Sequence, residues 1–320
     1  MKFYLSLVLL LSVLSFSYSK PSDLGKVYAI WHCGIDGCMW NTPINNSYVD
    51  WIVNRGDGIP TNNLFIFSFL NPVNILQQGI QAVPAGMSKS LIQYLQSQGL
   101  SVMFSIGGAG IVLNSWSSEW DQALTKDPTT LGKNAAAIAQ EFGVGIEIDY
   151  ESEANTPKLD AFVKAYRSVI PFDNSSSATD SSLLTVDTGA GTGYLTSVSL
   201  WASKWLEANE INWINAMVTG GPYGSLSEAT QYWNEHLYGT NWASIPPMRP
   251  EHLVVSLYSC DGSPNCNSYQ GTVLQAAVGW VNNATTRGIS FWVGGCVGGL
   301  NNNCCNDCTG LEQGSKNYLS

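Results

Sequence analysis

Three acidic side chains at alternate positions form the strongest chemical pattern in this sequence. The segment Val144–Glu151 reads Val-Gly-Ile-Glu-Ile-Asp-Tyr-Glu, so Glu147, Asp149 and Glu151 are spaced two residues apart. Because side chains on a β-strand alternate between its faces, the three carboxyl groups share one face. Burial and mutual repulsion raise the pKa of at least one of them. A carboxylic acid that stays protonated near neutral pH can act as a general acid, so the pattern predicts acid catalysis.

A strand of this kind has two possible environments. Its acids could lie in water at the edge of a sheet, or they could face the interior of a barrel. The residues between the acids are Ile146, Ile148 and Tyr150, which favours a strand whose other face packs under helices. Glu151 also falls at the carboxyl end of the strand, where the active sites of parallel barrels lie.

Eight apolar segments are expected to form strands, and one of them carries the acids. Their starts lie roughly 30 to 43 residues apart, which is the length of one strand and one helix. They are Val27–Cys33, Leu64–Leu70, Ser101–Ile106, Gly143–Tyr150, Leu183–Thr188, Trp213–Val218, Leu253–Tyr258 and Ile289–Val293. Amphipathic segments read as helices at Ser88–Gln98, Leu131–Phe142, Lys158–Ile170, Leu200–Asn209, Leu226–Leu237 and Thr272–Thr286. The alternation predicts an α/β fold, a single-domain (β/α)8 TIM barrel.

The composition narrows the possible partners. Of the 320 residues, 45% are hydrophobic and 12% are charged, and the formal net charge is −10. An acidic chain without a basic stripe has no surface suited to the phosphate backbone, so we expect no nucleic-acid partner. The hydrophobic content is enough for a large core, and we expect a monomer.

Residues 1–19 read as a secretory signal peptide. Lys2 gives a basic start, an apolar run follows, and Ser17 and Ser19 are small residues at a typical cleavage site. A transmembrane anchor is the alternative, but the apolar run is shorter than the ~20 residues that cross a bilayer. We therefore expect no membrane contact. Residues 20–320 are expected to form the catalytic barrel, secreted to the cell exterior or to a vacuolar or lysosomal lumen.

Eight cysteines fit an oxidising compartment, in which an even number favours disulfides. Cys33 and Cys38 frame a short loop after the first expected strand, and Cys260 and Cys266 frame one after the seventh. The C-terminal segment holds the remaining four, Cys296, Cys304, Cys305 and Cys308. Each of the first two pairs is expected to form a local disulfide, and the last four cysteines are expected to form two more. A zinc site at Cys304–Cys308 is the alternative, but we expect no metal and no cofactor. Asparagines that accept N-linked glycans are expected at Asn45, Asn174 and Asn283.

The acidic segment resembles the Asp-Gly-x-Asp-x-Asp-x-Glu signature of glycoside hydrolase family 18, which contains chitinases and endo-β-N-acetylglucosaminidases. Two further segments resemble motifs of this family in the matching order. Phe104-Ser-Ile-Gly-Gly108 is similar to the Ser-x-Gly-Gly motif of the third strand. Trp292 is similar to the tryptophan that floors the subsite of the cleaved sugar. The resemblance extends from Val27 to about Gly299, which is nearly the whole expected mature chain.

The resemblance implies a substrate-assisted mechanism. Glu151 would be the general acid, Asp149 would orient the acetamido group of the substrate as the nucleophile, and Glu147 would hold Asp149. This route differs from the usual scheme of two protein carboxylates. It implies a substrate with 2-acetamido groups, namely β-1,4-linked N-acetylglucosamine in chitin or chito-oligosaccharides. Two departures are local: Val144 replaces the first aspartate of the signature, and Glu147 is one methylene longer than the usual aspartate.

The sixth strand departs further from the family pattern. It reads Met217-Val-Thr-Gly220, where the family often has Met-x-Tyr-Asp. Thr219 therefore stands near the position of a tyrosine whose hydroxyl steadies the acetamido carbonyl. Tyr223 and Tyr258 are candidates to supply that hydroxyl, and Met217 and Thr219 are expected to border the same subsite.

Aromatic side chains are plentiful, with 12 Trp, 14 Tyr and 10 Phe. Sugar rings stack their C–H faces on aromatic planes, so a glycan cleft should contain some of them. Trp31, Trp40, Trp116 and Trp213 are candidates beside Trp292, with packing in the core as the alternative for each.

Other functions remain open from the sequence. A chitinase-like lectin without turnover is one, motivated by the altered sixth strand, and an endo-β-N-acetylglucosaminidase acting on N-glycans is another. A barrel glycosidase of a different family would need a second carboxylate, for which Asp187 and Asp261 are candidates. The loop Gly189-Ala-Gly-Thr-Gly193 faintly resembles a nucleotide-binding loop, but a tight barrel loop explains it better.

Overall fold

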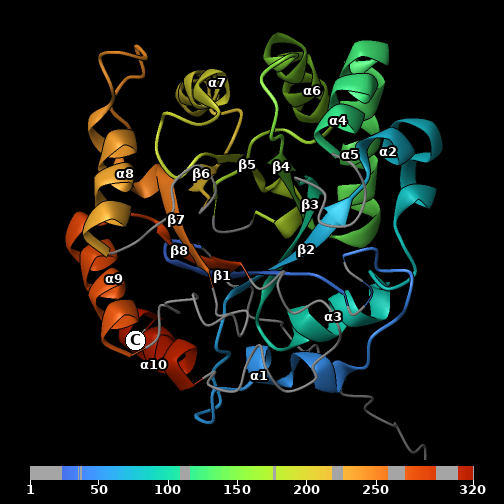
Figure 1. The fold of residues 1–320 in the computed structure, drawn as a ribbon. Helices are drawn as coiled ribbons and strands as arrows, with labels where there is room; N and C mark the ends of the chain where they lie inside the picture. The colour runs from blue at the N-terminus through green and yellow to red at the C-terminus, as the bar shows by residue number, and fades with distance from the viewer. Residues whose placement is uncertain are drawn as a thin grey trace, which may run out of the picture.

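The chain forms a closed barrel of eight parallel strands, seen in a computed structural model (Figure 1). The structure describes residues 24–34, 36, 38–108, 116–175, 178–217, 226–258, 271–292 and 309–319. The strands are β1 (Val27–His32), β2 (Leu64–Leu70), β3 (Ser101–Gly107), β4 (Gly145–Asp149), β5 (Leu184–Thr188), β6 (Trp213–Ala216), β7 (Leu253–Tyr258) and β8 (Gly288–Trp292). Each strand pairs with the next in the chain, and β8 pairs with β1, which closes the sheet.

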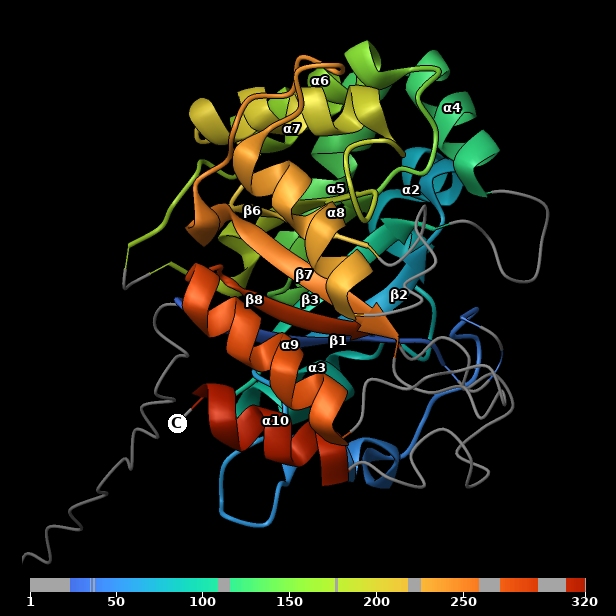
Figure 2. The ribbon, with the colours of Figure 1, turned by 60° about the vertical axis from the view of Figure 1, so that its left-hand side comes forward.

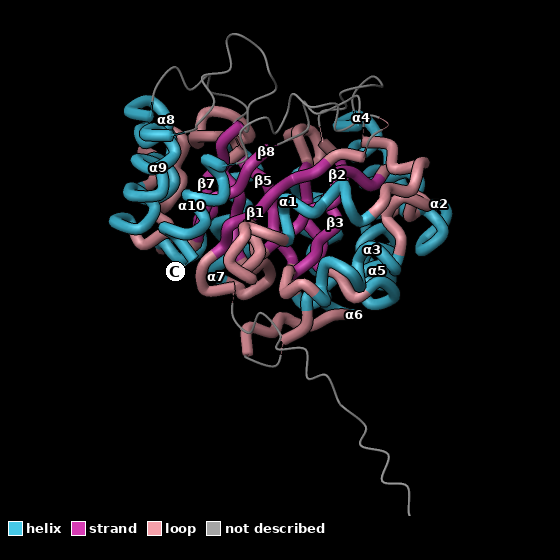
Figure 3. Tube along the Cα trace, turned by 90° about the horizontal axis from the view of Figure 1, so that it is seen from below, coloured by secondary structure: helices cyan, strands magenta, loops and turns pink. Residues whose placement is uncertain are grey.

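Helices surround the barrel on its outside, as Figure 3 shows. They are α1 (Asp50–Val53), α2 (Pro72–Gln78), α3 (Lys89–Ser97), α4 (Trp116–Lys126), α5 (Pro128–Phe142), α6 (Thr156–Val169), α7 (Thr196–Glu207), α8 (Leu226–Tyr238), α9 (Gly271–Ala284) and α10 (Thr309–Leu319). Short 3₁₀ turns are η1 (Asn46–Val49), η2 (Gly79–Ala82), η3 (Asp180–Ser182) and η4 (Pro250–His252). Among the described residues, no helix has both the length and the apolar character needed to span a membrane.

The TIM barrel expected from the sequence is confirmed, and each expected strand overlaps an observed one, with ends that differ by at most two residues. Strand β4 begins at Gly145 instead of Gly143. Gly143 has a φ of 67° and ends α5 in the left-handed conformation, which glycine adopts without a steric penalty. At the other end of α5, the Asp127 carboxylate accepts a hydrogen bond from the backbone N–H of Thr130 and caps the helix.

Alternation along the strands separates two apolar regions. Outward-facing residues of the strands pack against the helices in a large outer core. Inward-facing residues near the amino ends of the strands form a second, smaller core inside the barrel; they include Val27, Ile66, Met103, Trp213 and Val254. Above this inner core the inward positions become polar. The fold therefore supplies an apolar floor under a polar upper interior.

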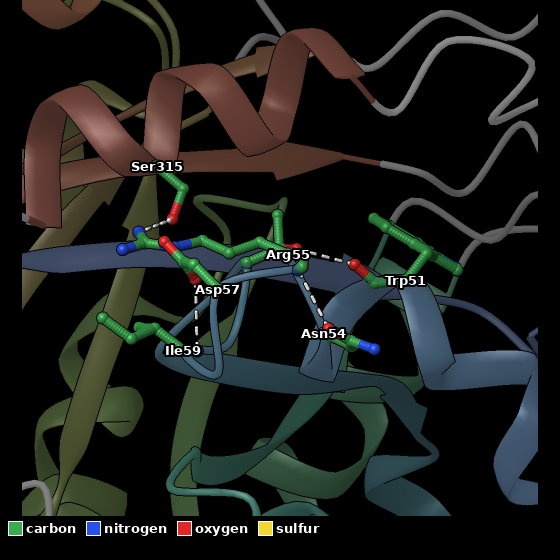
Figure 4. Close-up of polar contacts among 8 residues, drawn as sticks. Trp51, Asn54, Arg55, Asp57, Ile59 and Ser315 are labelled. Carbon is green, nitrogen blue, oxygen red and sulfur yellow. Dashed lines mark hydrogen bonds and ion pairs between the residues drawn. The ribbon is translucent and has the colours of Figure 1, made fainter.

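The C-terminal helix α10 completes the wall of the barrel beside α9 (Figure 2). The buried guanidinium of Arg55 reaches it, donating from Nη1 to the Ser315 hydroxyl at 3.0 Å (Figure 4). Arg55 Nε also donates to Asp57 at 2.9 Å, and this pair fixes the loop after α1. At the end of α10, Tyr318 donates its hydroxyl to the carbonyl of Arg287 at 2.7 Å. These contacts join α10 to the loop after α1 and to the residue before β8.

Candidate active site

Strand β4 places Glu147 and Asp149 inside the barrel, and Glu151 follows two residues after its end. Glu147 and Asp149 are buried, whereas Glu151 is partly exposed. Ile146 and Ile148 point the other way and pack in the outer core. The column of acids therefore runs from the interior of the barrel toward the mouth at the carboxyl ends of the strands.

Glu147 is held by donors on both of its oxygens. Trp31 of β1 donates its indole N–H to Oε1 at 2.6 Å, and Asn215 of β6 donates from Nδ2 to Oε2 at 2.7 Å. All three side chains are buried. Since hydrogen bonds donated to a carboxylate stabilise its charged form, this arrangement partly offsets the cost of burying Glu147.

A fourth acid, Asp187 of β5, belongs to the same buried network. Asn215 donates from Nδ2 to Asp187 Oδ1 at 2.8 Å, so one amide bridges Glu147 and Asp187. Its carbonyl Oδ1 accepts the indole N–H of Trp213 at 3.0 Å. The sequence singled out Asp187 only as a rival nucleophile and did not single out Asn215. The sequence does hold a signal for Asn215, because it lies two residues after the inward-facing Trp213 and so shares its face of the strand.

Burial raises the pKa of each buried acid. It raises the pKa of Glu147 to about 7, while hydrogen bonds, including that from Trp31, lower it. Burial raises the pKa of Asp149 well above its usual range, and the charges of Glu151 and Glu147 raise it further. The pKa of Asp187 is raised by burial and then by the charges of Glu147 and Asp149. These shifts favour the protonated forms of the three buried acids, which lowers the negative charge beneath Glu151.

Two glycines shape the wall beside Asp149. A Cβ on Gly107 would collide with the Asp149 carbonyl and the Trp120 indole, and one on Gly108 would lie 2.7 Å from the Phe69 ring. Their φ values are 115° and 85°, in the region that disfavours other residues. The backbone N–H of Gly108 donates to the Asp149 carbonyl at 3.0 Å. The glycine motif thus lets β3 and its loop lie directly against the end of β4.

Glu151 receives a hydroxyl from the loop after β5. Tyr194 donates its phenolic O–H to Glu151 Oε2 at 3.1 Å. The pKa of Tyr194 is raised by burial and by the neighbouring charge of Glu151, so the phenol stays protonated. The loop is fixed by Glu235 of α8, which accepts from the backbone N–H of Thr192 at 2.8 Å. Tyr194 was not singled out from the sequence because only the closed barrel brings this loop over β4.

The segment that carries Glu151 is anchored by Asp121 of α4. The Asp121 carboxylate accepts from the hydroxyls of Tyr150 at 2.6 Å and Ser152 at 2.8 Å, and from Asn155 Nδ2 at 2.8 Å. These residues lie on both sides of Glu151 in the chain. The backbone bearing the expected acid is therefore held from the helical layer.

Trp292 ends β8 at the same mouth of the barrel and is partly exposed. Its ring stacks on that of Phe69, with centroids 5.5 Å apart and planes 27° apart. A disulfide between Cys33 and Cys38 packs in the same small cluster, as the sequence predicted for this pair. Trp292 therefore offers a supported, partly exposed aromatic surface at the mouth of the barrel.

The other aromatic candidates have different surroundings. Trp31 is only 4% exposed, and its N–H is bonded to Glu147. Trp40 and Trp213 are core residues, which was the alternative to a place in the cleft. Both are buried, and their N–H groups are hydrogen-bonded within the protein. The side chain of Trp116 lies outside the described residues.

The expected hydroxyl donors near the sixth strand are mostly not described. Met217 is buried just after β6. Thr219 and Tyr223 lie outside the described residues, as does the side chain of Tyr258 at the end of β7. Asp261 and the cysteines expected to pair or to bind zinc, from Cys260 to Cys308, also lie outside them. Among the described residues, no group of three His, Cys, Asp or Glu side chains is placed to hold a metal ion.

No family model matches this sequence, and the search of curated proteins gave no significant match. Solved structures do resemble it. A family 18 chitinase from Cycas revoluta in complex with (GlcNAc)3 matches 92% of this chain and 100% of its own, with a TM-score of 0.58 and 15% identity. A chitinase from Rhizomucor miehei matches 92% and 99%, with a TM-score of 0.57 and 14% identity.

A fungal endo-β-N-acetylglucosaminidase of family 18 is similar to the same degree, matching 91% of this chain and 98% of its own, with a TM-score of 0.57 and 13% identity. At these identities the likeness establishes the shared fold. The chain therefore has the barrel fold of the glycoside hydrolase family 18 enzymes, as the sequence motifs predicted.

Proposed function

We propose that this protein is a retaining glycoside hydrolase that cleaves β-1,4-linked N-acetylglucosamine in chitin or chito-oligosaccharides. The observation that carries the proposal is the column of acids on β4, which ends in Glu151 at the mouth of a barrel with the family 18 fold. Among the similar structures are Cycas revoluta chitinases in complex with (GlcNAc)3 and (GlcNAc)4.

Glu151 is the proposed general acid, which gives its proton to the glycosidic oxygen. Its partial exposure leaves it open to a substrate at the mouth of the barrel, in contrast to the buried Glu147. Tyr194 and the Asp121 anchor restrict where the Glu151 side chain can lie. Such restriction favours proton transfer, which requires hydrogen-bond geometry between the acid and the leaving oxygen.

Asp149 is proposed to orient the acetamido group of the substrate. Its buried Oδ1 has no hydrogen-bond partner among the described residues, so a ligand N–H bonded there would satisfy an otherwise unpaired acceptor. An acetamide N–H bonded there would turn the carbonyl oxygen toward the anomeric carbon, where it attacks as Glu151 protonates the leaving group. Glu147 precedes Asp149 by two residues in the same column and is proposed to hold it in place.

Trp292 is proposed as the floor of the subsite for the cleaved sugar. Sugar C–H faces stack on aromatic planes, and Phe69 fixes the Trp292 ring from one side. Tyr223, Tyr258, Met217 and Thr219 remain the proposed border of the acetamido pocket. Trp31 is proposed to act by donating a hydrogen bond to Glu147. Because Trp31 is buried, it supports the acids and does not contact the sugar directly.

The alternatives differ in how they use these residues. An endo-β-N-acetylglucosaminidase would apply the same chemistry to N-glycan cores. A lectin would bind the glycan without cleaving it. The altered sixth strand is the reason to consider this alternative. A nucleophilic Asp187 is disfavoured, because this side chain is 2% exposed and bonded through Asn215 to Glu147.

Secretion is part of the proposal. The N-terminal segment with signal-peptide character lies outside the described residues. The asparagines of the three glycosylation sequons, Asn45, Asn174 and Asn283, are all exposed, as attachment of a glycan requires. The disulfide between Cys33 and Cys38 fits an oxidising compartment.

The test is incubation of the purified protein with chito-oligosaccharides and, separately, with a high-mannose N-glycan. Hydrolysis of chito-oligosaccharides is expected for the wild type and for Glu141→Gln, a surface carboxylate on α5. Glu151→Gln should lose at least about a hundredfold in kcat, the scale of general acid catalysis. Tight binding without cleavage would favour the lectin, and cleavage of the N-glycan alone would favour the endo-glycosidase. Equal activity of Glu151→Gln would refute the assignment of the acid.

A further inference from the structure

The amide of Asn215 has a fixed orientation. An indole N–H is a donor only, so the Trp213 N–H at 3.0 Å requires the carbonyl Oδ1 of Asn215 on its side. The NH2 group must then face the two carboxyl groups, at 2.7 Å from Glu147 and 2.8 Å from Asp187. Asn215 therefore offers one hydrogen to each acid.

The two acids differ in the donors they receive. Glu147 accepts on both oxygens, from Trp31 and from Asn215. Asp187 accepts on Oδ1 from Asn215. Two donated hydrogen bonds favour the ionised form of Glu147 more strongly than one favours that of Asp187. Both side chains are buried, so the pair is unfavourable unless one of them is neutral.

Among the residues that the structure describes, no positive charge acts on either carboxyl group of the pair. The groups that act on Asp187 electrostatically are Glu147 and Asp149, both acidic. The other described neighbours in the network are the uncharged Trp31, Asn215 and Trp213 side chains. Only a shared proton can then relieve the repulsion between the two acids.

We propose that Asp187 keeps this proton, so that the Glu147–Asp187 pair carries its single negative charge on Glu147 and Asp187 acts as a positioning residue for the acid column. Neutral Asp187 then donates its carboxyl O–H to Glu147, while Asn215 holds the two side chains in register. Burial raises the pKa of both acids, and a hydrogen bond between the two carboxyl groups lowers that of Glu147 and raises that of Asp187 further, in agreement with this placement of the proton. A residue on β5, outside the acidic segment, thereby sets the charge beneath Asp149.

Two substitutions at Asp187 separate this role from simple packing. Asp187→Asn has the shape of the neutral acid, with an N–H to donate to Glu147 and an oxygen to accept from Asn215. Asp187→Ala removes both. On chito-oligosaccharides, Asp187→Asn should keep kcat within about threefold of the wild type, whereas Asp187→Ala and Glu147→Gln should each lose about tenfold or more, with little change in KM. The kinetic arm rests on the proposed function.

A second experiment, which does not depend on enzymatic activity, tests the location of the proton by thermal unfolding at several pH values. A group whose folded pKa is raised contributes stability that is lost as the pH rises. The melting temperature of the wild type should therefore fall between pH 5 and pH 8, and Asp187→Asn, which cannot titrate, should flatten that fall.

An unchanged slope of melting temperature against pH in Asp187→Asn would overturn the proposal. The kinetics could also overturn the proposal. If Asp187→Asn lost as much kcat as Asp187→Ala while Glu147→Gln kept the wild-type kcat, the proton would be on Glu147. Absence of hydrolysis in the wild type would refute the proposed function but leave the thermal result decisive for the pair.

Discussion

At the residue scale, the site combines one partly exposed acid with a set of buried ones. Tyr194 donates to Glu151 at 3.1 Å and helps fix its side chain. Tyr194→Phe removes that donor and little else, so we expect kcat on chito-oligosaccharides to fall roughly tenfold, the usual value of a hydrogen bond to a charged group. Tyr238→Phe is the matched control, because Tyr238 is 73% exposed. Equal kcat values for the two variants would show that Tyr194 has no such role.

The buried acids also make stability depend on pH. Burial raises the pKa of Glu147 to about 7 in the folded protein, above its value in the unfolded chain. The folded Glu147–Asp187 pair then keeps one proton that the unfolded chain has released, so the contribution of this pair to stability is greatest at low pH and falls as the pH rises toward 7. Glu147→Gln should reduce the fall in melting temperature between pH 5 and pH 7. A steeper fall in the variant, measured by thermal unfolding across that range, would contradict this assignment.

At the element scale, the close approach of β3 and β4 depends on two glycines. Gly107→Ala would drive a Cβ into the Asp149 carbonyl at a φ of 115°. We expect a loss of roughly 2 to 4 kcal/mol in the free energy of unfolding, together with loss of activity, since the backbone at Asp149 must shift. The control is Gly279→Ala in α9, whose added Cβ meets nothing within 4 Å. That variant should be as stable as the wild type or slightly more stable. A melting temperature of Gly107→Ala equal to that of the control would contradict the packing described.

The elements also show what a sequence can predict. The strands followed from short apolar runs, and the inward column on β4 followed from strict alternation in one segment. Helix α2 was not predicted because it has seven residues, too few for a clear helical period. Asn215 and Tyr194 join the site from β6 and the loop after β5, and their partners lie 68 and 43 residues away in the chain. No local pattern encodes such contacts; they require the closed barrel.

At the scale of the whole molecule, the C-terminal helix depends on one buried cation. Arg55 is 5% exposed and binds both Asp57 and Ser315 of α10. Arg55→Gln leaves Asp57 without its cation and α10 without this anchor. We expect a lower melting temperature and faster proteolysis near the C-terminus, chiefly because the buried bond to Ser315 is lost while Asp57 stays solvated. Lys164→Gln removes an exposed pair with Asp160 and should cost less than about 1 kcal/mol. Similar melting temperatures for both variants would contradict the anchoring role.

In the proposed mechanism, the acetamido group of the substrate, positioned by Asp149, attacks while Glu151 protonates the leaving oxygen. The most direct measurement is the anomeric configuration of the first product, followed by proton NMR during hydrolysis of a chito-oligosaccharide. Substrate-assisted attack predicts the β-anomer as the initial product and no cleavage of the equivalent β-1,4-glucose oligosaccharide, which has no acetamido group. An initial α-anomer, or equal cleavage of the glucose oligosaccharide, would contradict the claim.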